Sequence, residues 1–342
     1  MVNGEWKEKM KFKSQYSLLF LILISMVLGG CRPAAAIETS ETLKLTETQE
    51  VANTPEPTET TVSALPEGVS IVPGLGKSFY DQVYCRVDGV DLIFDLHYPL
   101  KGEAPYPLVI FVHGGSWQIG DRRGGTGVVF TDALLDAGYA FAGIDYRLAP
   151  ENTFPAMIED VKCAARFFRA NADLLDLDPD RFAALGGSAG GHLVTLLGLT
   201  ADQDLWESSG QYQGVSSRVA AVVDMFGPMD LRILADPEYR GDWGNVFGDA
   251  VYDSDAMWEI SPLAYVTRDD PPFLILQGDL DDSVLLHHSQ DLQAALEEVG
   301  VPAELIIVYG GGHGVELFQQ GATPDLNSLT ESLLAFLGEY LK

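Results

Sequence analysis

The segment that most constrains the fold of this chain is a glycine-flanked serine at the end of a short apolar run. Ser188 lies in the sequence GGSAG (186–190), directly after Phe182–Leu185. This spacing builds a sharp strand-to-helix turn, because glycine tolerates a close backbone approach that a side chain would block. The turn lifts the serine hydroxyl above the sheet, and the backbone N–H of Ala189 faces a developing oxyanion. Ser188 is therefore a candidate nucleophile, provided that a base, an acid and further oxyanion donors accompany it.

Composition bounds the size of the core and excludes one class of partner. With 342 residues, of which 46% are hydrophobic, the chain is long enough for one large α/β domain or two small ones. The formal net charge is −29 and the isoelectric point is near 4.3. An acidic surface repels phosphate, so we expect no nucleic-acid partner.

The N-terminal residues have the pattern of an exported protein. A lysine-rich stretch precedes the apolar run Leu18–Leu28, which is too short for a comfortable transmembrane helix. The run ends in LGGC, which resembles a bacterial lipobox, so we expect residues 1–30 to be a signal peptide and Cys31 to be lipidated. The alternatives are an ordinary signal peptide cut near Ala34–Ala36 or a short membrane anchor. Met10 is an alternative start.

Residues 31–70 are predicted to form a disordered acidic stalk. They are rich in Thr, Glu, Ala and Pro and cannot bury enough apolar area to offset chain entropy. Two or more acyl chains hold a protein stably on a membrane, and an acidic surface resists adsorption to anionic lipid. We therefore expect an extracytoplasmic lipoprotein, on the membrane or the cell surface, that contacts the membrane through its lipid alone.

Strand and helix patterns alternate along the remaining chain, which we expect to form one domain over residues 71–342. Such alternation is typical of a mainly parallel sheet with helices on both faces. The expected strands are a hairpin, 80–87 and 90–98, followed by 107–112, 139–144, 182–185, 219–226, 272–277 and 303–309. The expected helices are 155–172, 189–199, 289–299 and 328–341.

An insertion over residues 231–262 interrupts this alternation. It contains Trp243 and Trp258 among many aspartates and glycines. Ligands bind at the carboxyl ends of the strands in open α/β sheets, and long insertions in compact domains are usually functional. We expect a small cap or partial lid rather than a solvated loop.

The two cysteines within this domain are Cys85, in an expected edge strand, and Cys163, in an expected helix. Export permits a disulfide, but nothing in the sequence places these two residues together. Two buried free thiols are the favoured interpretation.

His313 is the candidate base. In this type of fold the partners of the serine follow in the order Ser, Asp or Glu, His. His97 and His113 precede Ser188. His192 lies on the helix after Ser188, where packing is expected, and His287 and His288 lie too near the candidate acid in sequence. His313 follows the last expected strand in YGGGHG (309–314), and a flexible glycine loop can carry an imidazole over the sheet edge.

The acid is expected after the preceding strand, in QGDLDDSV (277–284). This segment offers Asp279, Asp281 and Asp282. Aspartates are common in turns, where the side chain bonds the local backbone. The spacing therefore does not separate the three.

Further oxyanion donors are expected in HGGSW (113–117), which follows the apolar strand PLVIFV. The backbone N–H groups of Gly114 and Gly115 are the candidates beside that of Ala189, and a simple glycine turn is the alternative. Trp117, Trp243 and Trp258 are candidate walls of a substrate pocket, with core packing as the equal alternative.

Other polar residues are expected to have structural roles. Arg147, Glu151 and Asp160 form a candidate structural polar network rather than a catalytic one. No spacing of His, Cys and Asp indicates a metal site, so neither a metal nor a cofactor is expected. The acidic stretches 236–242 and 249–255 are expected to be solvated rather than to bind Ca²⁺.

With these motifs the chain resembles the α/β-hydrolase esterases, close to their hormone-sensitive-lipase-like and feruloyl/acetyl-xylan-esterase-like branch. The matching stretches follow the order of the family over residues 78–340: HGGSW, DYRLAPE, GGSAGGH, FGPMDL, SP, GDLDDSV and GGGHG. The resemblance implies an α/β-hydrolase fold with a mostly parallel eight-stranded sheet and a serine carboxylesterase activity. It leaves the oligomeric state open.

The resemblance also selects the acid. In the family pattern H-G-x-x-D-x-x-V-P the acid precedes the valine by three positions, which is Asp281 here. Three residues depart from the family pattern: Gln277 replaces the usual His, Leu285 the usual Pro, and Ser116 the third glycine of the oxyanion loop. The Ser116 side chain is expected to narrow the mouth of the site against bulky alcohols.

The substrates implied are short-chain or carbohydrate-linked esters, small or attached to polysaccharide, by analogy and from the expected location. A serine peptidase of the prolyl-oligopeptidase type is an alternative, although that branch usually carries a large additional propeller domain. A catalytically inactive binding protein is a second alternative, but it predicts the loss of a triad residue, and all three are present.

Overall fold

The computed structural model describes residues 65, 67, 69–201, 203, 205–207 and 210–341. The predicted signal peptide, the predicted lipidation at Cys31 and almost all of the predicted stalk lie outside these residues. None of the helices in the described part of the chain is long and apolar enough to cross a membrane.

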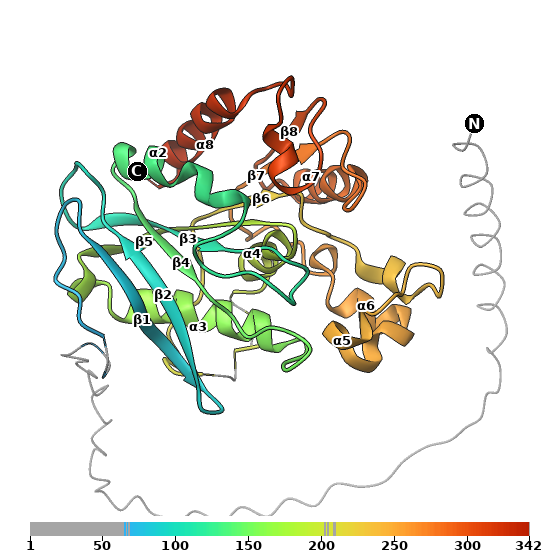
Figure 1. Ribbon diagram of the computed structural model, residues 1–342, viewed down its shortest axis with the longest axis horizontal. Helices are drawn as coiled ribbons and strands as arrows, with labels where there is room; N and C mark the ends of the chain where they lie inside the picture. The colour runs from blue at the N-terminus through green and yellow to red at the C-terminus, as the bar shows by residue number, and fades with distance from the viewer. Residues whose placement is uncertain are drawn as a thin grey trace, which may run out of the picture. The chain divides into compact units, whose positions relative to one another are not determined.

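An eight-stranded sheet runs through the described residues in the order β1-β2-β4-β3-β5-β6-β7-β8 (Figure 1). β1 and β4 both pair antiparallel with β2, and all other neighbours are parallel. The strands are β1 (Ser78–Val87), β2 (Val90–His97), β3 (Tyr106–Val112), β4 (Ala140–Ile144), β5 (Leu177–Gly187), β6 (Ala221–Met225), β7 (Phe273–Gly278) and β8 (Ala303–Val308). The mostly parallel sheet and its initial hairpin are as the sequence predicts.

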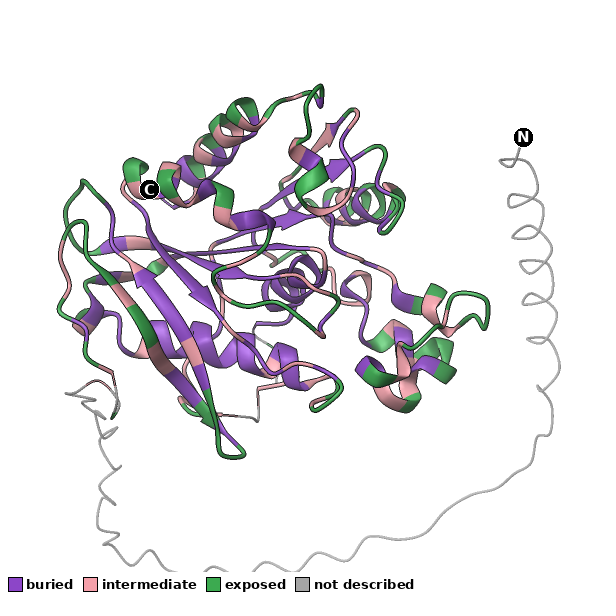
Figure 2. Cartoon of the chain, in the orientation of Figure 1, coloured by how far each residue is buried: buried purple, intermediate pink, exposed green. Residues whose placement is uncertain are grey.

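The longer helices cover both faces of this sheet. α3, α4 and α7 pack into one buried cluster, and α2 and α8 into another. These helices are α2 (Thr131–Ala137), α3 (Ala156–Ala170), α4 (Ala189–Thr200), α7 (His287–Val299) and α8 (Leu326–Tyr340), with the 3-10 turns η1 (Thr126–Phe130), η2 (Asp173–Leu175) and η6 (Gly314–Phe318). Figure 2 shows α4 buried with the central strands, which agrees with its apolar sequence on all sides.

The sequence does not predict α2. This helix has seven residues and buries only Leu134, so its apolar periodicity covers less than two turns. Gly138, at φ 97°, ends it in the left-handed conformation that glycine adopts without a steric penalty. A short helix with a single buried position leaves too weak a pattern to recognise.

The insertion over residues 231–262, called the cap from here on, folds into short helices rather than a solvated loop. It connects β6 to β7. Its elements are η3 (Leu231–Ala235), α5 (Gly244–Phe247), η4 (Gly248–Tyr252) and α6 (Ser254–Glu259), followed by η5 (Pro262–Ala264). Val246, Val251 and Met257 of the cap are buried and belong to the same hydrophobic cluster as α3 and α4, so the cap packs on the domain.

Cys85 and Cys163 form a disulfide, so the prediction of two free thiols is wrong. Cys85 lies on β1 and Cys163 on α3, and both side chains are buried in the same cluster. Their Cα atoms are 6.5 Å apart, within the range of disulfides. The sequence alone did not show that α3 packs beneath β1, the edge strand of the sheet.

Loss of this disulfide should destabilise the domain. The bond joins residues 78 positions apart, so it constrains a long loop of the unfolded chain. We expect Cys85→Ala/Cys163→Ala to lower the free energy of unfolding by about 2–4 kcal/mol. Urea denaturation followed by intrinsic fluorescence measures the change. A reductant should lower the midpoint of the wild type but not that of the double variant; equal midpoints without reductant would contradict the account.

Candidate active site

Ser188 lies at the turn between β5 and α4, in a strained backbone conformation. Its φ of 56° and ψ of −122° fall in a region that non-glycine residues rarely adopt. The glycines around it permit the close packing of this turn: a Cβ on Gly190 would lie 2.2 Å from the carbonyl oxygen of Val112, and a Cβ on Gly186 would lie 2.4 Å from that of Gly190. The turn therefore has the geometry that the GGSAG sequence predicts.

His313 reaches Ser188 from the loop after β8. Its Nε2 lies 3.0 Å from Ser188 Oγ, and its Nδ1 lies 2.7 Å from Asp281 Oδ2. Because a carboxylate only accepts, Nδ1 carries the proton and donates it to Asp281. Nε2 is then free to accept the hydrogen bond from the Ser188 hydroxyl. The ring of Phe226 contacts the imidazole edge to face at a centroid distance of 4.9 Å.

Asp281 is the aspartate that contacts His313, as the family pattern implied. Its Oδ1 accepts the backbone N–H groups of Ser283 and Val284. Burial alone would raise the pKa of the Asp281 carboxyl, but the hydrogen bonds from His313 and from Val284 hold this pKa below its usual value. The carboxylate thus stays charged where it meets the imidazole.

The neighbouring acids have other contacts. Asp279 accepts the backbone N–H of Gly310 at 2.6 Å and so ties down the loop that carries His313. Asp282 is exposed and contacts the hydroxyl of Ser283. Gln277, the departure from the usual histidine, donates through Nε2 to Asp281 Oδ2 at 3.2 Å and is itself held by the hydroxyl of Ser289.

The candidate oxyanion donors come from two loops that meet at Ser188. Gly114 and Gly115 follow β3, and Ala189 begins α4. In the described part of the chain, the backbone N–H groups of Gly114 and Gly115 donate to no other group. The N–H of Ala189 belongs to the first turn of α4, where helical N–H groups have no partner within the helix. All three donors are therefore available to an anion beside Ser188.

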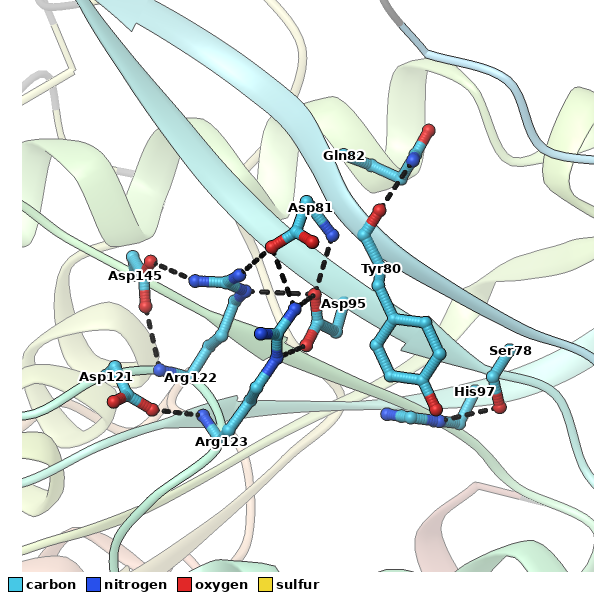
Figure 3. A network of polar contacts seen from close by, with 10 residues as sticks. All are labelled: Ser78, Tyr80, Asp81, Gln82, Asp95, His97, Asp121, Arg122, Arg123 and Asp145. Carbon is cyan, nitrogen blue, oxygen red and sulfur yellow. Dashed lines mark hydrogen bonds and ion pairs between the residues drawn. The ribbon is translucent and has the colours of Figure 1, made fainter.

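A network of arginines and aspartates anchors the loop that follows Gly115 (Figure 3). Arg122 donates to Asp95 on β2 at 2.9 Å, and its backbone N–H donates to Asp145 after β4 at 2.7 Å. Arg122 also pairs with Asp81 on β1, as does Arg123. Burial alone would raise the pKa of Asp95, but hydrogen bonds from Arg123 and Arg122 keep this pKa below its usual value. The loop is thus fixed to three strands.

Two cavities adjoin Ser188 and His313, and both residues line each of them. The cap-side cavity has a volume of about 400 Å³ and is lined by Ser116, Trp117, Ser188, Pro228, Asp230, Leu231, Ile233, Leu234, Trp243, Ser283, Val284, His288 and His313. The loop-side cavity, of about 370 Å³, lies along the glycines of the oxyanion loop, with Phe226 and Ile119. An ester has two substituents on its reacting carbonyl, and each cavity has room for one.

Of the three tryptophans proposed for the pocket, two line the cap-side cavity and one does not. Trp117 and Trp243 line the cap-side cavity and contact each other edge to face. Trp258 is absent from the linings of both cavities, which corrects its prediction. Its ring lies 4.3 Å from the Arg232 guanidinium, so a cation–π contact within the cap accounts for it.

Sequence reasoning missed His288 and Asp230 in the cap-side cavity. His288 was excluded as the base for its closeness to Asp281 in sequence, but it is the second residue of α7 and lines the cavity. Its Nδ1 accepts the backbone N–H groups of Met229 and Asp230 at 3.2 and 3.4 Å, so Nε2 carries the proton. Burial and the neighbouring His287 lower the pKa of His288 to about 4. The sequence signals that could have indicated these two residues are the FGPMDL stretch, which contains Asp230, and the histidine pair at the start of a helix.

Of the polar network predicted from Arg147, Glu151 and Asp160, the structure contains the pair of Arg147 with Asp160 but not Glu151. Arg147 and Asp160 form a buried ion pair at 2.8 Å. Glu159 joins this pair at 3.3 Å, in the place predicted for Glu151, which is exposed. His192 is fully buried and donates from Nε2 to the carbonyl oxygen of Ile260 at 2.9 Å.

Comparisons with known proteins agree with this fold. The BD-FAE family model matches residues 94–296. Esterase LipC of Mycobacterium tuberculosis is 32% identical over 226 residues, which cover 64% of this chain and 55% of LipC. Versiconal hemiacetal acetate esterase of Dothistroma septosporum is 28% identical over 284 residues, which cover 77% of this chain and 83% of that esterase.

A solved structure described as a truncated carbohydrate esterase from gut microbiota matches with a TM-score of 0.67 and 29% identity, over 78% of this chain and 98% of that one. The predicted α/β-hydrolase fold is confirmed by this likeness and by the sheet. The chain spans about half the length of the first curated relatives that it matches.

Proposed function

This chain belongs to the BD-FAE family, and from that premise we propose that it is a serine carboxylesterase acting on short-chain or carbohydrate-linked carboxylic esters. The observation that carries the proposal is the hydrogen-bonded chain from Ser188 Oγ through His313 to Asp281, in which Ser188 and His313 line two cavities. A nucleophile, a base and an orienting carboxylate in this arrangement are the components of acyl transfer through a covalent intermediate.

In the proposed mechanism, His313 Nε2 takes the hydroxyl proton while Ser188 Oγ attacks the ester carbonyl carbon. The carbonyl oxygen becomes an oxyanion and accepts the N–H groups of Gly114, Gly115 and Ala189. The bond to the alkoxy group then breaks, and the leaving alcohol takes the proton from His313. A water molecule repeats the sequence on the acyl-enzyme and releases the carboxylic acid. Asp281 orients the imidazole and stabilises its charged form throughout.

The cap-side cavity supports the carbohydrate-linked part of this proposal. Its lining combines the apolar rings of Trp117 and Trp243 with the polar side chains of His288, Asp230 and Ser283. Because His288 is neutral with its proton on Nε2, it presents a fixed hydrogen-bond donor. The Asp230 carboxylate pairs with Arg232, and its remaining lone pairs can accept from a hydroxyl. A polyhydroxylated group has both an apolar face and hydroxyls that suit these walls. One solved relative is itself described as a carbohydrate esterase.

His288→Leu should therefore change the preference between substrates more than the rate of the chemical step. A polar substrate that loses its partner in a buried site loses about 1–3 kcal/mol of binding. We expect kcat/KM for acetylated xylo-oligosaccharides to fall by about tenfold, and kcat/KM for p-nitrophenyl acetate to change by less than about twofold. Initial rates on both substrates measure these changes in kcat/KM. Feruloylated oligosaccharides and esters of increasing acyl length complete the substrate panel.

The matched control for this prediction is His287→Leu, at the exposed neighbouring position, which should leave both values unchanged. An equal loss on both substrates in His288→Leu would contradict a role in recognising the polar group. Absence of hydrolysis by the wild type across the whole panel would contradict the esterase proposal itself.

For location, we propose an exported lipoprotein anchored through Cys31. A buried disulfide supports an oxidising compartment, and the LGGC sequence supports lipidation. In bacteria that process lipoproteins, radiolabelled palmitate should be incorporated into the wild type and lost in Cys31→Ala, with Cys85→Ala/Cys163→Ala as the control that keeps the label. Label that persists in Cys31→Ala would refute lipidation at this residue.

A further inference from the structure

The oxyanion loop, residues 113–125, connects β3 to η1, and its second half is held to the domain without apolar packing. The structure describes every residue of this half, 118–125, and none of them buries an apolar side chain; Ile119 is 70% exposed. Gly120 and Gly125 have φ of 113° and 98°, in the left-handed region that glycine adopts freely. A glycine-containing segment of this kind needs another anchor to keep one conformation, because ordering it costs chain entropy.

The side chain of Arg122 supplies this anchor. It is only 10% exposed, although it comes from an exposed loop. Figure 3 shows the guanidinium among three carboxylates, one on β1, one on β2 and one after β4. It pairs with Asp95 at 2.9 Å, with Asp145 at 2.5 Å and with Asp81. The planar fork of arginine has enough donors to bridge several carboxylates at once.

The backbone of Arg122 is fixed at the same place. Its N–H donates to Asp145 Oδ1 at 2.7 Å. On β4, a Cβ at Gly143 would overlap the carbonyl oxygen of Arg122, so the loop lies directly against the strand at this point. Side chain and backbone together therefore tie the second half of the loop to the sheet.

From Arg122 the tie reaches the first half of the loop through Gly120. A Cβ on Gly120 would lie 2.8 Å from the carbonyl oxygen of Gly114 and would overlap the His113 imidazole. That carbonyl also accepts a hydrogen bond from His113 Nδ1 at 2.7 Å. The returning chain thus packs against the peptide group that joins Gly114 to Gly115.

This peptide group carries one of the oxyanion donors. A peptide is planar and trans, so the carbonyl of Gly114 and the N–H of Gly115 point in opposite directions. Contacts that fix the direction of the carbonyl therefore also fix the direction of the N–H. The position of Gly120 restricts rotation of this peptide, and Arg122 holds Gly120 in that position.

We propose that Arg122 is a positioning residue that aims the N–H of Gly115 into the oxyanion hole. Its ion pairs with Asp95 and Asp145 hold the returning chain against the peptide that carries this donor. The inference rests on the proposed function, because it concerns the site of that reaction. The restraint on the loop is nevertheless measurable without any substrate.

Arg123 provides the matched comparison. It pairs with Asp95 at 2.5 Å and with Asp81 at 2.8 Å, so it shares two carboxylates with its neighbour. Its side chain is 50% exposed, and within the described residues it makes no ion pair with Asp145. If neutralising Asp95 were the whole role of these arginines, loss of either one would have the same effect.

Hydrogen exchange of the full chain, read by mass spectrometry, measures the restraint directly. In Arg122→Met the buried carboxylate of Asp95 keeps its pair with Arg123, so we expect the domain to fold. Amides in residues 113–121 should exchange at least about tenfold faster in Arg122→Met than in the wild type, because local opening becomes easier. They should exchange at the wild-type rate in Arg123→Met. Peptides from β7 should be unchanged in both variants.

Kinetics on p-nitrophenyl acetate measures the effect on the oxyanion donor. A displaced donor weakens binding of the transition state more than that of the substrate, so Arg122→Met should lower kcat by about 10–100-fold and change KM by less than about threefold. Arg123→Met should keep kcat within about twofold of the wild type, because exposed ion pairs contribute little. Asp145→Ala should also lower kcat, and Arg122→Met/Asp145→Ala should be no slower than Asp145→Ala, since both changes remove the same tie.

Three results would overturn the proposal. The first is a wild-type kcat in Arg122→Met, and the second is an equal loss of kcat in Arg123→Met. The third is a loss of kcat in Arg122→Met without faster exchange in residues 113–121, because the effect would then not pass through the loop. If exchange changes as expected but the wild type hydrolyses no ester, the proposed function is contradicted and the tie between Arg122 and the loop stands.

Discussion

Ser188→Ala should abolish ester hydrolysis while leaving the fold intact. The hydroxyl is the group that His313 Nε2 contacts at 3.0 Å, and in the proposed mechanism no other side chain attacks the ester. Removal of the nucleophile from a serine triad lowers kcat by about 10⁶-fold. Alanine keeps the Cβ of the strained turn, so the thermal unfolding midpoint should change little. The rate of p-nitrophenyl acetate hydrolysis measures the effect.

Ser332→Ala is the matched control for this variant. Ser332 lies on α8 and lines a different cavity, with Phe273 and Pro302. It should retain the full rate. Substantial turnover by Ser188→Ala, above the rate of a catalyst-free solution and proportional to protein concentration, would show that the nucleophile has been assigned wrongly.

Asp281→Asn should have the second largest effect. An amide in place of the carboxylate can hold the imidazole in the wrong tautomer, with the proton on Nε2, where it cannot accept from Ser188. It also removes the charge that stabilises the imidazolium. A substitution of this kind lowers kcat by about 10⁴-fold with the geometry preserved. Steady-state kinetics on p-nitrophenyl acetate gives the value.

The two neighbouring aspartates supply the comparison. Asp279→Asn keeps an oxygen that can accept from Gly310, and Asp282 is exposed, so Asp282→Asn loses little. We expect each to retain kcat within about tenfold of the wild type. If either variant loses more activity than Asp281→Asn, the acid has been assigned wrongly.

The sequence predicted the sheet and the position of the site because those features leave local signals. Buried parallel strands such as β3 are continuous apolar runs, and Ser188 lies in a turn whose glycines are required by local backbone contacts. His313 followed from chain order and elimination. The choice of Asp281 as the acid did not follow from the residues alone. Three aspartates lie within four positions, and they differ only in the direction that the turn gives to each side chain. The family pattern selected it, and the contact with His313 agrees.

The features that sequence reasoning missed depend on packing between distant segments. The bond between Cys85 and Cys163 requires α3 to lie beneath the edge strand, which no local pattern encodes. His288 is close to Asp281 in sequence and yet lines the same cavity as Ser188, because α7 begins at the cavity wall. Trp258 was assigned to a pocket by residue type, whereas its ring packs on Arg232 within the cap.

The central claim is that Ser188 is the nucleophile, and covalent labelling tests it most directly. A fluorophosphonate reacts with an activated serine and leaves a stable phosphonyl ester at that oxygen. We predict that activity falls in proportion to labelling, that a single group is incorporated per chain, and that mass spectrometry locates it on the peptide containing Ser188. Full labelling at another residue, or full labelling of Ser188 with esterase activity retained, would contradict the account.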